Sequence, residues 1–258
     1  MERLIGILAL LVSLAACASG VTFPSATFGS GKGKGLQVSG LLFKPKGNGP
    51  FPAVVLLHTC GGIRSHVRDD WPRFLNGLGY VALTVDSYGP RGATRCTDLN
   101  YFERGFGQAS DAYGALDYLA GLPFVDGKRV AVMGFSDGAG AINNFVLPLK
   151  MGAGRVRDFK AAIALYGHCR GMTGYTAKDL PLFEIAAEHD VNLAPSCIAI
   201  ARGTPMELHV LKGAYHAFDQ MEANGRSDPF GNVMLYSAKA VTESQALVKD
   251  FLARHLGT

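Results

Sequence analysis

A pentapeptide of the form G-x-S-x-G, Gly134-Phe135-Ser136-Asp137-Gly138, stands near the middle of the chain. An apolar stretch from Arg129 to Met133 precedes it, and residues Ala139 to Leu149 are apolar enough to continue as a helix. In a sharp strand-to-helix turn, two such glycines let the backbone pass close to its neighbours and expose the serine oxygen above the sheet. Ser136 is therefore the candidate nucleophile, although the pattern also fits a packed turn that merely contains a serine.

A serine nucleophile needs a histidine that accepts its proton and an acid that orients this histidine. Asp190 follows the apolar stretch Pro181 to Ala187, and His216 follows the apolar stretch Met206 to Leu211. Groups that follow parallel strands meet at one edge of a sheet, and this kind of turn requires the chain order serine, acid, histidine. The sequence thus predicts a triad of Ser136, Asp190 and His216.

Other acids and histidines compete for these roles. Glu188 and Asp219 are the alternative acids. His189 lies on the wrong side of the required chain order. His209 falls within a predicted strand, where a core or surface role is expected.

Acyl transfer through a serine also needs two N–H donors for the developing oxyanion. The first donor is the amide of Asp137, the residue after the nucleophile. The second is expected from the loop His58 to Gly62, and we assign it to the amide of Cys60. His58 is then interpreted as structural, because the site requires a backbone donor at this loop.

Alternating strands and helices are predicted around these residues. The expected strands are Val21–Phe28, Leu36–Phe43, Pro52–His58, Tyr80–Asp86, Arg129–Met133, Phe159–Tyr166, Pro181–Ala187 and Met206–Leu211, and the expected helices are Val67–Leu78, Gln108–Gly121, Ala139–Leu149 and Ser237–His255. The first two strands are expected to begin the sheet as an antiparallel pair. The strand Pro52–His58 is a continuous apolar run, which is typical of a strand covered on both faces. The predicted fold class is α/β, with a mostly parallel sheet and helices on both faces.

The composition is that of a globular chain. Its 258 residues, 48% of them hydrophobic, can bury a full core, and we expect one domain over residues 17–258. The net charge of +4 is modest, and no block of basic residues is interleaved with aromatic ones. Nucleic-acid binding therefore has little support, and a small molecule is the expected partner.

The N-terminus resembles an export signal. An apolar run from Leu4 to Ala16 is too short to span a bilayer comfortably. Its end, Leu14-Ala15-Ala16-Cys17, resembles the lipobox of bacterial lipoproteins, in which the cysteine becomes the lipidated first residue. The sequence thus predicts a signal peptide over residues 1–16, a lipid anchor on Cys17 and a periplasmic or membrane-anchored location. Cleavage after Ala18, which would leave a soluble secreted protein, is the alternative.

Several segments together resemble the dienelactone hydrolase family of α/β-hydrolases. They are GFSDG (134–138), LLHTCGG (56–62), VDSYGPRG (85–92), DAYGALDYL (111–119) with PFVD (123–126) after it, and KGAYHAFD (212–219). The resemblance covers roughly Leu42 to Leu256. It implies an α/β-hydrolase fold with an eight-stranded sheet, a serine or cysteine, aspartate and histidine triad, and hydrolysis of small esters or lactones without a cofactor or a metal.

The chain departs from this family at two kinds of position. True dienelactone hydrolases use a cysteine nucleophile restrained by a glutamate after the third strand, whereas this chain has Ser136 and Thr59 there. A serine needs no such restraint, so the two changes are consistent with each other. They argue against dienelactone itself as the substrate. The family also holds a substrate carboxylate with arginines. Arg91 lies near one such position and is a candidate substrate-binding residue, with a structural loop arginine as the alternative; Asp219 or Gln220 occupies the other position.

Four cysteines remain besides Cys17, an even number that fits an oxidising compartment. In the sheet of this family the strands that precede Cys60 and Cys96 are neighbours, and so are those that precede Cys169 and Cys197. The resemblance therefore favours the disulfides Cys60–Cys96 and Cys169–Cys197. Four free, buried thiols are the alternative.

The predicted function is that of an exported serine hydrolase. It would cleave carboxylic esters or lactones through Ser136, His216 and Asp190 by way of an acyl-enzyme intermediate. The same triad on this fold also supports peptide or amide hydrolysis. A catalytically inactive hydrolase scaffold that serves as a binding protein of the cell envelope is the remaining alternative.

Overall fold

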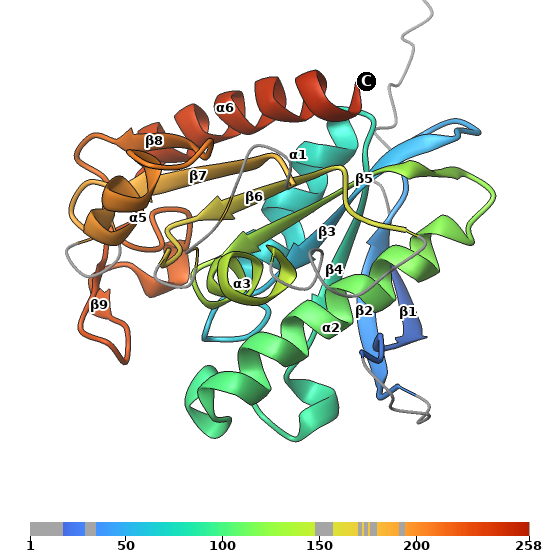
Figure 1. Cartoon of the computed structure of the whole chain (residues 1–258), viewed down its shortest axis with the longest axis horizontal. Coiled ribbons are helices and arrows are strands. Elements are labelled where there is room, and N and C mark those ends of the chain that lie inside the picture. The colour runs from blue at the N-terminus through green and yellow to red at the C-terminus, as the bar shows by residue number, and fades with distance from the viewer. Residues whose placement is uncertain are drawn as a thin grey trace, which may run out of the picture.

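An eight-stranded sheet forms the centre of this computed structural model, which describes residues 18–28, 35–147, 157–169, 172, 175, 180–190 and 194–257 (Figure 1). The strands are β1 (Ser19–Pro24), β2 (Gln37–Phe43), β3 (Phe51–Leu57), β4 (Val81–Asp86), β5 (Val125–Phe135), β6 (Ala161–Leu165), β7 (Leu182–Ala187) and β8 (Glu207–Leu211). Their order across the sheet is β1-β2-β4-β3-β5-β6-β7-β8. The pairs β1–β2 and β2–β4 are antiparallel, and all the following pairs are parallel.

Helices cover both faces of this sheet. They are α1 (Trp71–Gly77), α2 (Tyr101–Ala120), α3 (Asp137–Ala141), α5 (Ala194–Ala201) and α6 (Ala238–Leu256), with single π-helical turns η1 (His66–Asp70) before α1 and η4 (Ile142–Val146) after α3. Figure 1 shows α2 and α3 in front of the sheet and α1 behind it. A short hairpin, β9 (Arg226–Ser227) and β10 (Val233–Met234), stands apart from the sheet.

The core is divided by the sheet into two layers. On one face, alternate strand residues such as Leu57 and Val132 pack with α2 and α3. On the other face, residues such as Leu56 and Met133 pack with α1 and α6. Because both faces are covered, the central strands are apolar at nearly every position rather than at every second one. The structure confirms the predicted α/β fold with its mostly parallel, eight-stranded sheet.

The predicted bounds differ most at α2, which begins at Tyr101 and not at Gln108. Asn100 caps it: its side chain accepts a hydrogen bond from the Glu103 amide, and Glu103 accepts one from the Asn100 amide. Two glycines weaken the helical pattern in this first part. Tertiary packing accounts for them: a Cβ on Gly105 would lie 2.2 Å from the Phe145 ring, which leaves no room for a side chain, and one on Gly107 would lie 3.0 Å from Arg91 Nε, a tight contact.

Other predicted elements are shifted or shortened. The first strand ends at Pro24, four residues before the predicted end. The strand before Ser136 begins at Val125, earlier than predicted, and the helix after it is five residues long before it widens into η4. The end of that predicted helix lies outside the described residues.

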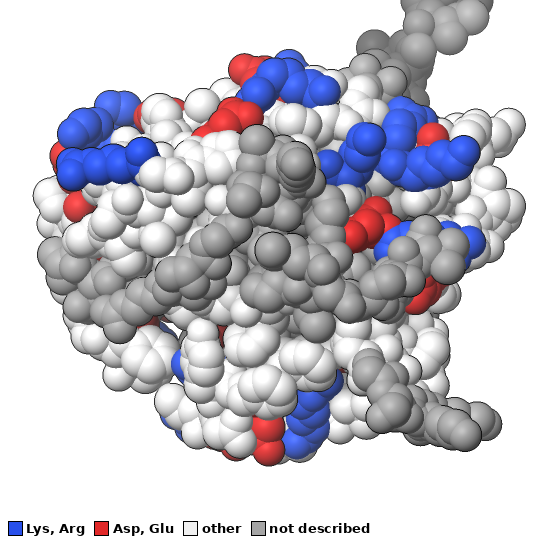
Figure 2. All heavy atoms as spheres, viewed as in Figure 1, with Lys and Arg blue, Asp and Glu red and all other residues white. Residues whose placement is uncertain are grey.

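The molecular surface mixes charges of both signs. On the face shown in Figure 2, lysine and arginine side chains lie beside aspartate and glutamate side chains. Among the helices of the described residues, none is long and apolar enough to cross a membrane.

Candidate active site

Ser136 occupies a strained turn between β5 and α3. Its φ and ψ are 51° and −105°, a conformation that a residue with a side chain rarely adopts. The turn is held from two sides: the Ser136 amide donates to Leu165 O (3.0 Å) and the Gly138 amide donates to His58 O (3.1 Å). Backbone strain of this kind persists only where the surroundings fix it, and it commonly marks a functional residue.

Close packing explains both glycines of the pentapeptide. A Cβ on Gly134 would lie 2.4 Å from Gly138 O, and a Cβ on Gly138 would lie 2.5 Å from Leu57 O. Neither position can hold a side chain without moving backbone. The glycine pattern that singled out Ser136 therefore reflects two close approaches: that of β5 to the start of α3, at Gly134, and that of the turn to the end of β3, at Gly138.

Ser136, His216 and Asp190 form a continuous hydrogen-bonded chain. Ser136 Oγ lies 3.0 Å from His216 Nε2, and His216 Nδ1 lies 2.6 Å from Asp190 Oδ2. His216 and Asp190 are buried, in the loops that follow β8 and β7. A carboxylate on Nδ1 fixes the proton there and leaves Nε2 free to accept the serine proton. The three residues that the strand order predicted as a triad thus lie in contact.

The competing acids bind other groups. Glu188 accepts hydrogen bonds from Lys212 Nζ (2.9 Å) and the Gly213 amide (2.8 Å). Asp219 accepts hydrogen bonds from Trp71 Nε1 (2.8 Å) and the Tyr166 hydroxyl (2.7 Å). Both contacts fix the loop after β8, which carries His216: Glu188 binds its start at Gly213, and Asp219 lies within it.

The loop after β3 turns sharply beside Ser136. The Gly62 amide donates to Thr59 O (3.0 Å), and Gly62 has a φ of 75°, which glycine adopts without strain. Cys60 is fixed within this turn by a disulfide to Cys96 and by a hydrogen bond from the Cys96 amide to Cys60 O (2.8 Å). The Asp137 amide belongs to the first turn of α3, where amides have no acceptor within the helix.

His58 is a buried histidine with a clear structural role. Nδ1 lies 2.9 Å from Thr59 O, and Nε2 lies 3.2 Å from the Ser87 amide nitrogen. This pairing assigns the proton to Nδ1 and the acceptor role to Nε2. Burial lowers the pKa of His58 below its ordinary value, with the hydrogen bond to Thr59 opposing the shift. The side chain is therefore neutral and ties the loop after β3 to the loop after β4.

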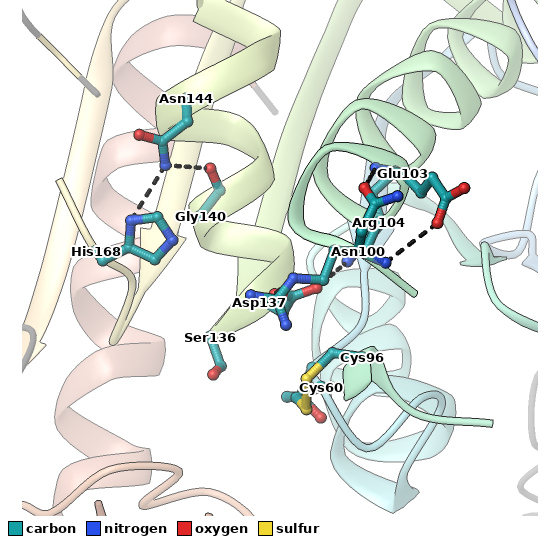
Figure 3. A network of polar contacts seen from close by, with 12 residues as sticks. Cys60, Cys96, Asn100, Glu103, Arg104, Ser136, Asp137, Gly140, Asn144 and His168 are labelled. Carbon is teal, nitrogen blue, oxygen red and sulfur yellow. Dashed lines mark hydrogen bonds and ion pairs between the residues drawn. A yellow bond between two sulfur atoms is a disulfide. The ribbon is translucent and has the colours of Figure 1, made fainter. Parts of the chain in front are cut away.

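Asp137 is the centre of a polar network that the sequence did not reveal. Its Oδ2 accepts hydrogen bonds from the Tyr88 hydroxyl (2.6 Å) and Gln108 Nε2 (3.0 Å), and its Oδ1 lies 3.3 Å from Arg104 Nε. Burial, together with the Asp137 charge, raises the pKa of Tyr88, which therefore remains a donor. Figure 3 shows Arg104 of α2 reaching Asp137 at the start of α3, next to Ser136. No motif links these residues, because three different elements supply them.

Arg91, the candidate substrate-binding residue, is engaged by the protein itself. Its Nη1 and Nη2 donate to the two carboxylate oxygens of buried Asp111 at 2.7 Å and 3.1 Å, and Nη1 also donates to Ser87 O at 2.7 Å. These contacts favour the structural alternative for Arg91.

Both disulfides favoured by the sheet topology are present. Cys60 is bonded to Cys96, and Cys169 is bonded to Cys197. The predicted signal peptide, residues 1–16, and the predicted lipidation site, Cys17, lie outside the described residues.

Glu184, in β7, is a buried acid beside the second disulfide. Its Oε1 accepts a hydrogen bond from the Gly167 amide (3.0 Å) and its Oε2 one from Asn143 Nδ2 (3.0 Å). Burial raises the pKa of Glu184 to about 7, against the effect of these two donors. With Cys169 and Cys197 it forms a group of three potential metal ligands in the described part of the chain. The two sulfur atoms are joined to each other, so this group offers no thiolate.

Known proteins resemble the chain in sequence and in structure. The sequence model of the dienelactone hydrolase family matches residues 38–256. Esterase FrsA of Klebsiella pneumoniae (strain 342) is 35% identical over 108 residues, which are 41% of this chain and 24% of that protein. The chain thus spans about a quarter of the length of this curated relative.

Two solved structures share the fold over nearly the whole chain. The dienelactone hydrolase of Anabaena variabilis ATCC 29413 has a TM-score of 0.68 at 18% identity, over 94% of this chain and 99% of that one. The dienelactone hydrolase-like promiscuous phosphotriesterase P91, from metagenomic libraries, has a TM-score of 0.68 at 21% identity, over 93% and 99%. At such identities the likeness shows the α/β-hydrolase fold.

Replacing Glu184 tests the role of its burial. Its pKa is about 7 in the folded chain against an ordinary value of 4.5. Between these pH values the folded state keeps a proton that the unfolded state has lost, so the free energy of unfolding falls as pH rises, by roughly 3 kcal/mol. Glu184→Gln lacks this titration, and its stability relative to the wild type should increase from about pH 4.5 to about pH 7.

Urea unfolding across this pH range measures the difference. Asp250→Asn, which removes an exposed carboxylate on α6, is the matched control and should not show this rise. A Glu184→Gln curve that is parallel to the wild type would mean that Glu184 titrates normally in the folded chain.

Proposed function

Because the chain belongs to the dienelactone hydrolase family, we propose that it is a serine hydrolase that cleaves carboxylic esters or lactones. The observation that carries this proposal is the continuous chain from Ser136 Oγ to His216 Nε2 (3.0 Å) and from His216 Nδ1 to Asp190 Oδ2 (2.6 Å). These distances fall within the range that proton transfer requires. A loop histidine or a packed serine would have no reason to form this arrangement.

The proposed reaction begins with attack of Ser136 Oγ on the ester carbonyl carbon, while His216 Nε2 takes the hydroxyl proton. Asp190 stabilises the imidazolium that forms. The carbonyl oxygen becomes negative, and in this proposal the amides of Asp137 and Cys60 donate hydrogen bonds to it. Collapse of the tetrahedral intermediate breaks the ester bond, and the leaving alcohol oxygen collects the proton from Nε2. Water then hydrolyses the acyl-enzyme by the same steps.

The two residues that supply the proposed oxyanion donors are anchored to other parts of the protein through their side chains. The Asp137 carboxylate has three side-chain partners, and Cys60 has a covalent one. An oxyanion hole works because its donors do not need to reorganise when charge develops. These two anchors therefore support a site built for acyl transfer.

We further propose that the chain is exported. The two disulfides fit an oxidising compartment, and the N-terminal residues 1–16 have the composition of a signal peptide. Lipidation of Cys17 is part of this proposal.

Labelling with a fluorophosphonate tests the proposed nucleophile. We expect one label per folded chain, on the peptide that contains Ser136, because only a serine with an aligned base reacts readily. Ser136→Ala and His216→Ala should abolish labelling, and Asp190→Asn should slow it by roughly 10³-fold or more. Intact mass and peptide mapping give the stoichiometry and the site.

Labelling should be followed by hydrolysis of an ester panel with a peptide panel beside it. Turnover of esters or lactones is the expected result. Turnover of peptides alone would replace the esterase by a peptidase, and a folded chain that takes no label would be a catalytically inactive scaffold.

Intact mass of the chain from bacterial membranes tests export. The expected product begins at Cys17 and carries a lipid, and Cys17→Ser should move the chain out of the membrane fraction. A chain that retains Met1 would contradict the proposed processing.

A further inference from the structure

A second carboxylate lies beside the catalytic histidine, on the opposite side from Asp190. Asp228 Oδ2 is 3.8 Å from His216 Nε2, the nitrogen that contacts Ser136 Oγ at 3.0 Å. The Asp228 side chain is only 9% exposed. Asp190 binds Nδ1 and orients the ring, whereas Asp228 stands at the nitrogen that exchanges the proton.

The loop between β9 and β10 fixes this carboxylate. Asp228 Oδ1 accepts hydrogen bonds from the amides of Phe230 (2.9 Å) and Asn232 (2.8 Å), and Oδ2 accepts one from Asn232 Nδ2 (2.8 Å). The end of the hairpin is joined to the histidine loop through a β-bridge between His216 and Met234. Asp228 is therefore held at the site by its own loop rather than by contact with the histidine.

In the described part of the chain, the donors that contact the Asp228 carboxylate are neutral amides, and no lysine or arginine forms an ion pair with it. The other two acids of the site have partners: Asp137 contacts Arg104, and Asp190 contacts His216 Nδ1. The titratable side chain nearest to Asp228 among the described residues is His216, at 3.8 Å, and a histidine that is ready to accept a proton carries no charge. Arg104 also contacts the loop between β9 and β10, but its contact there is with the Phe230 ring, 5.5 Å from the ring centroid, and its ion pair is with Asp137.

The chemistry of the proposed reaction places the alcohol part of the ester next to Asp228. The leaving oxygen must come within hydrogen-bond distance of His216 Nε2, about 3 Å, to collect its proton. A carboxylate 3.8 Å from that nitrogen is then a close neighbour of the leaving group. A negative charge on the alcohol part would be repelled there, and a positive one attracted.

We propose that Asp228 sets the charge preference of the site: it favours esters of neutral or cationic alcohols over esters whose alcohol part carries a carboxylate. This inference rests on the proposed function. The proposed preference is opposite to that for an anionic substrate, which arginines would hold. The candidate arginine for that role, Arg91, is already bound to Asp111.

Three acetate esters that differ in the charge of the leaving group test the inference. They are phenyl acetate, 4-acetoxybenzoate and 4-acetoxyphenyl-trimethylammonium, with each kcat/KM divided by the rate of hydroxide-catalysed hydrolysis of the same ester. Two unit charges about 7 Å apart in a partly buried site change a rate by one to two orders of magnitude. We therefore expect the wild type to favour the cationic over the anionic ester by at least about tenfold, and Asp228→Asn to lose most of this preference.

Two further variants separate charge from loop structure. Asp228→Ser also removes the charge and retains an oxygen that can accept from the loop amides, so it should lose the preference in the same way. Glu243→Gln removes a distant negative charge on α6 and should keep the preference. The melting temperature of each variant shows whether it is folded.

The outcomes distinguish the two proposals. If all variants hydrolyse phenyl acetate and the ratio is unchanged in both Asp228 variants, the inference about substrate charge is overturned while the esterase stands. If Ser136 takes no label and the wild type hydrolyses none of the three esters, the proposed function fails, and the inference fails with it.

Discussion

The close approach of the Ser136 turn to the end of β3 is the constraint on which the rest of the candidate site depends. A Cβ on Gly138 would lie 2.5 Å from Leu57 O and 2.8 Å from His58 O, so backbone meets backbone there with no side chain between. The contact brings the first amides of α3 beside the loop after β3. This geometry forces Ser136 into a strained backbone conformation with a positive φ. Hydrogen bonds from the Ser136 and Gly138 amides stabilise that conformation.

Side chains from distant parts of the chain keep this arrangement rigid. Asp137 is tied to α2 and to the loop after β4, and Cys60 is tied covalently to Cys96. His58, which is neutral because it is buried, joins the loop after β3 to the loop after β4. Each contact acts on backbone that flanks Ser136 and not on Ser136 itself. A reacting oxygen held between fixed donors is the physical requirement for stabilising a developing charge.

The sequence predicted those parts of the site that topology determines. Ser136, Asp190 and His216 could be found because carboxyl ends of parallel strands share one edge of the sheet, whatever the loop conformations. Arg104 and Asp228 could not be found, because their contacts with Asp137 and His216 depend on where α2 begins and how the 226–234 hairpin folds. The predicted start of α2 was wrong for a related reason: Gly105 and Gly107 weaken the helical pattern, but they fit the close packing of α2 against Phe145 and Arg91.

A crystal structure of the chain after reaction with a fluorophosphonate tests the central claim most directly. The account predicts a phosphorus atom bonded to Ser136 Oγ, with one phosphonyl oxygen within hydrogen-bond distance of both the Asp137 and Cys60 amides. The imidazole of His216 should remain on Asp190. An adduct whose oxygen points away from these two amides would contradict the proposed oxyanion hole, and an adduct on another residue would contradict the nucleophile.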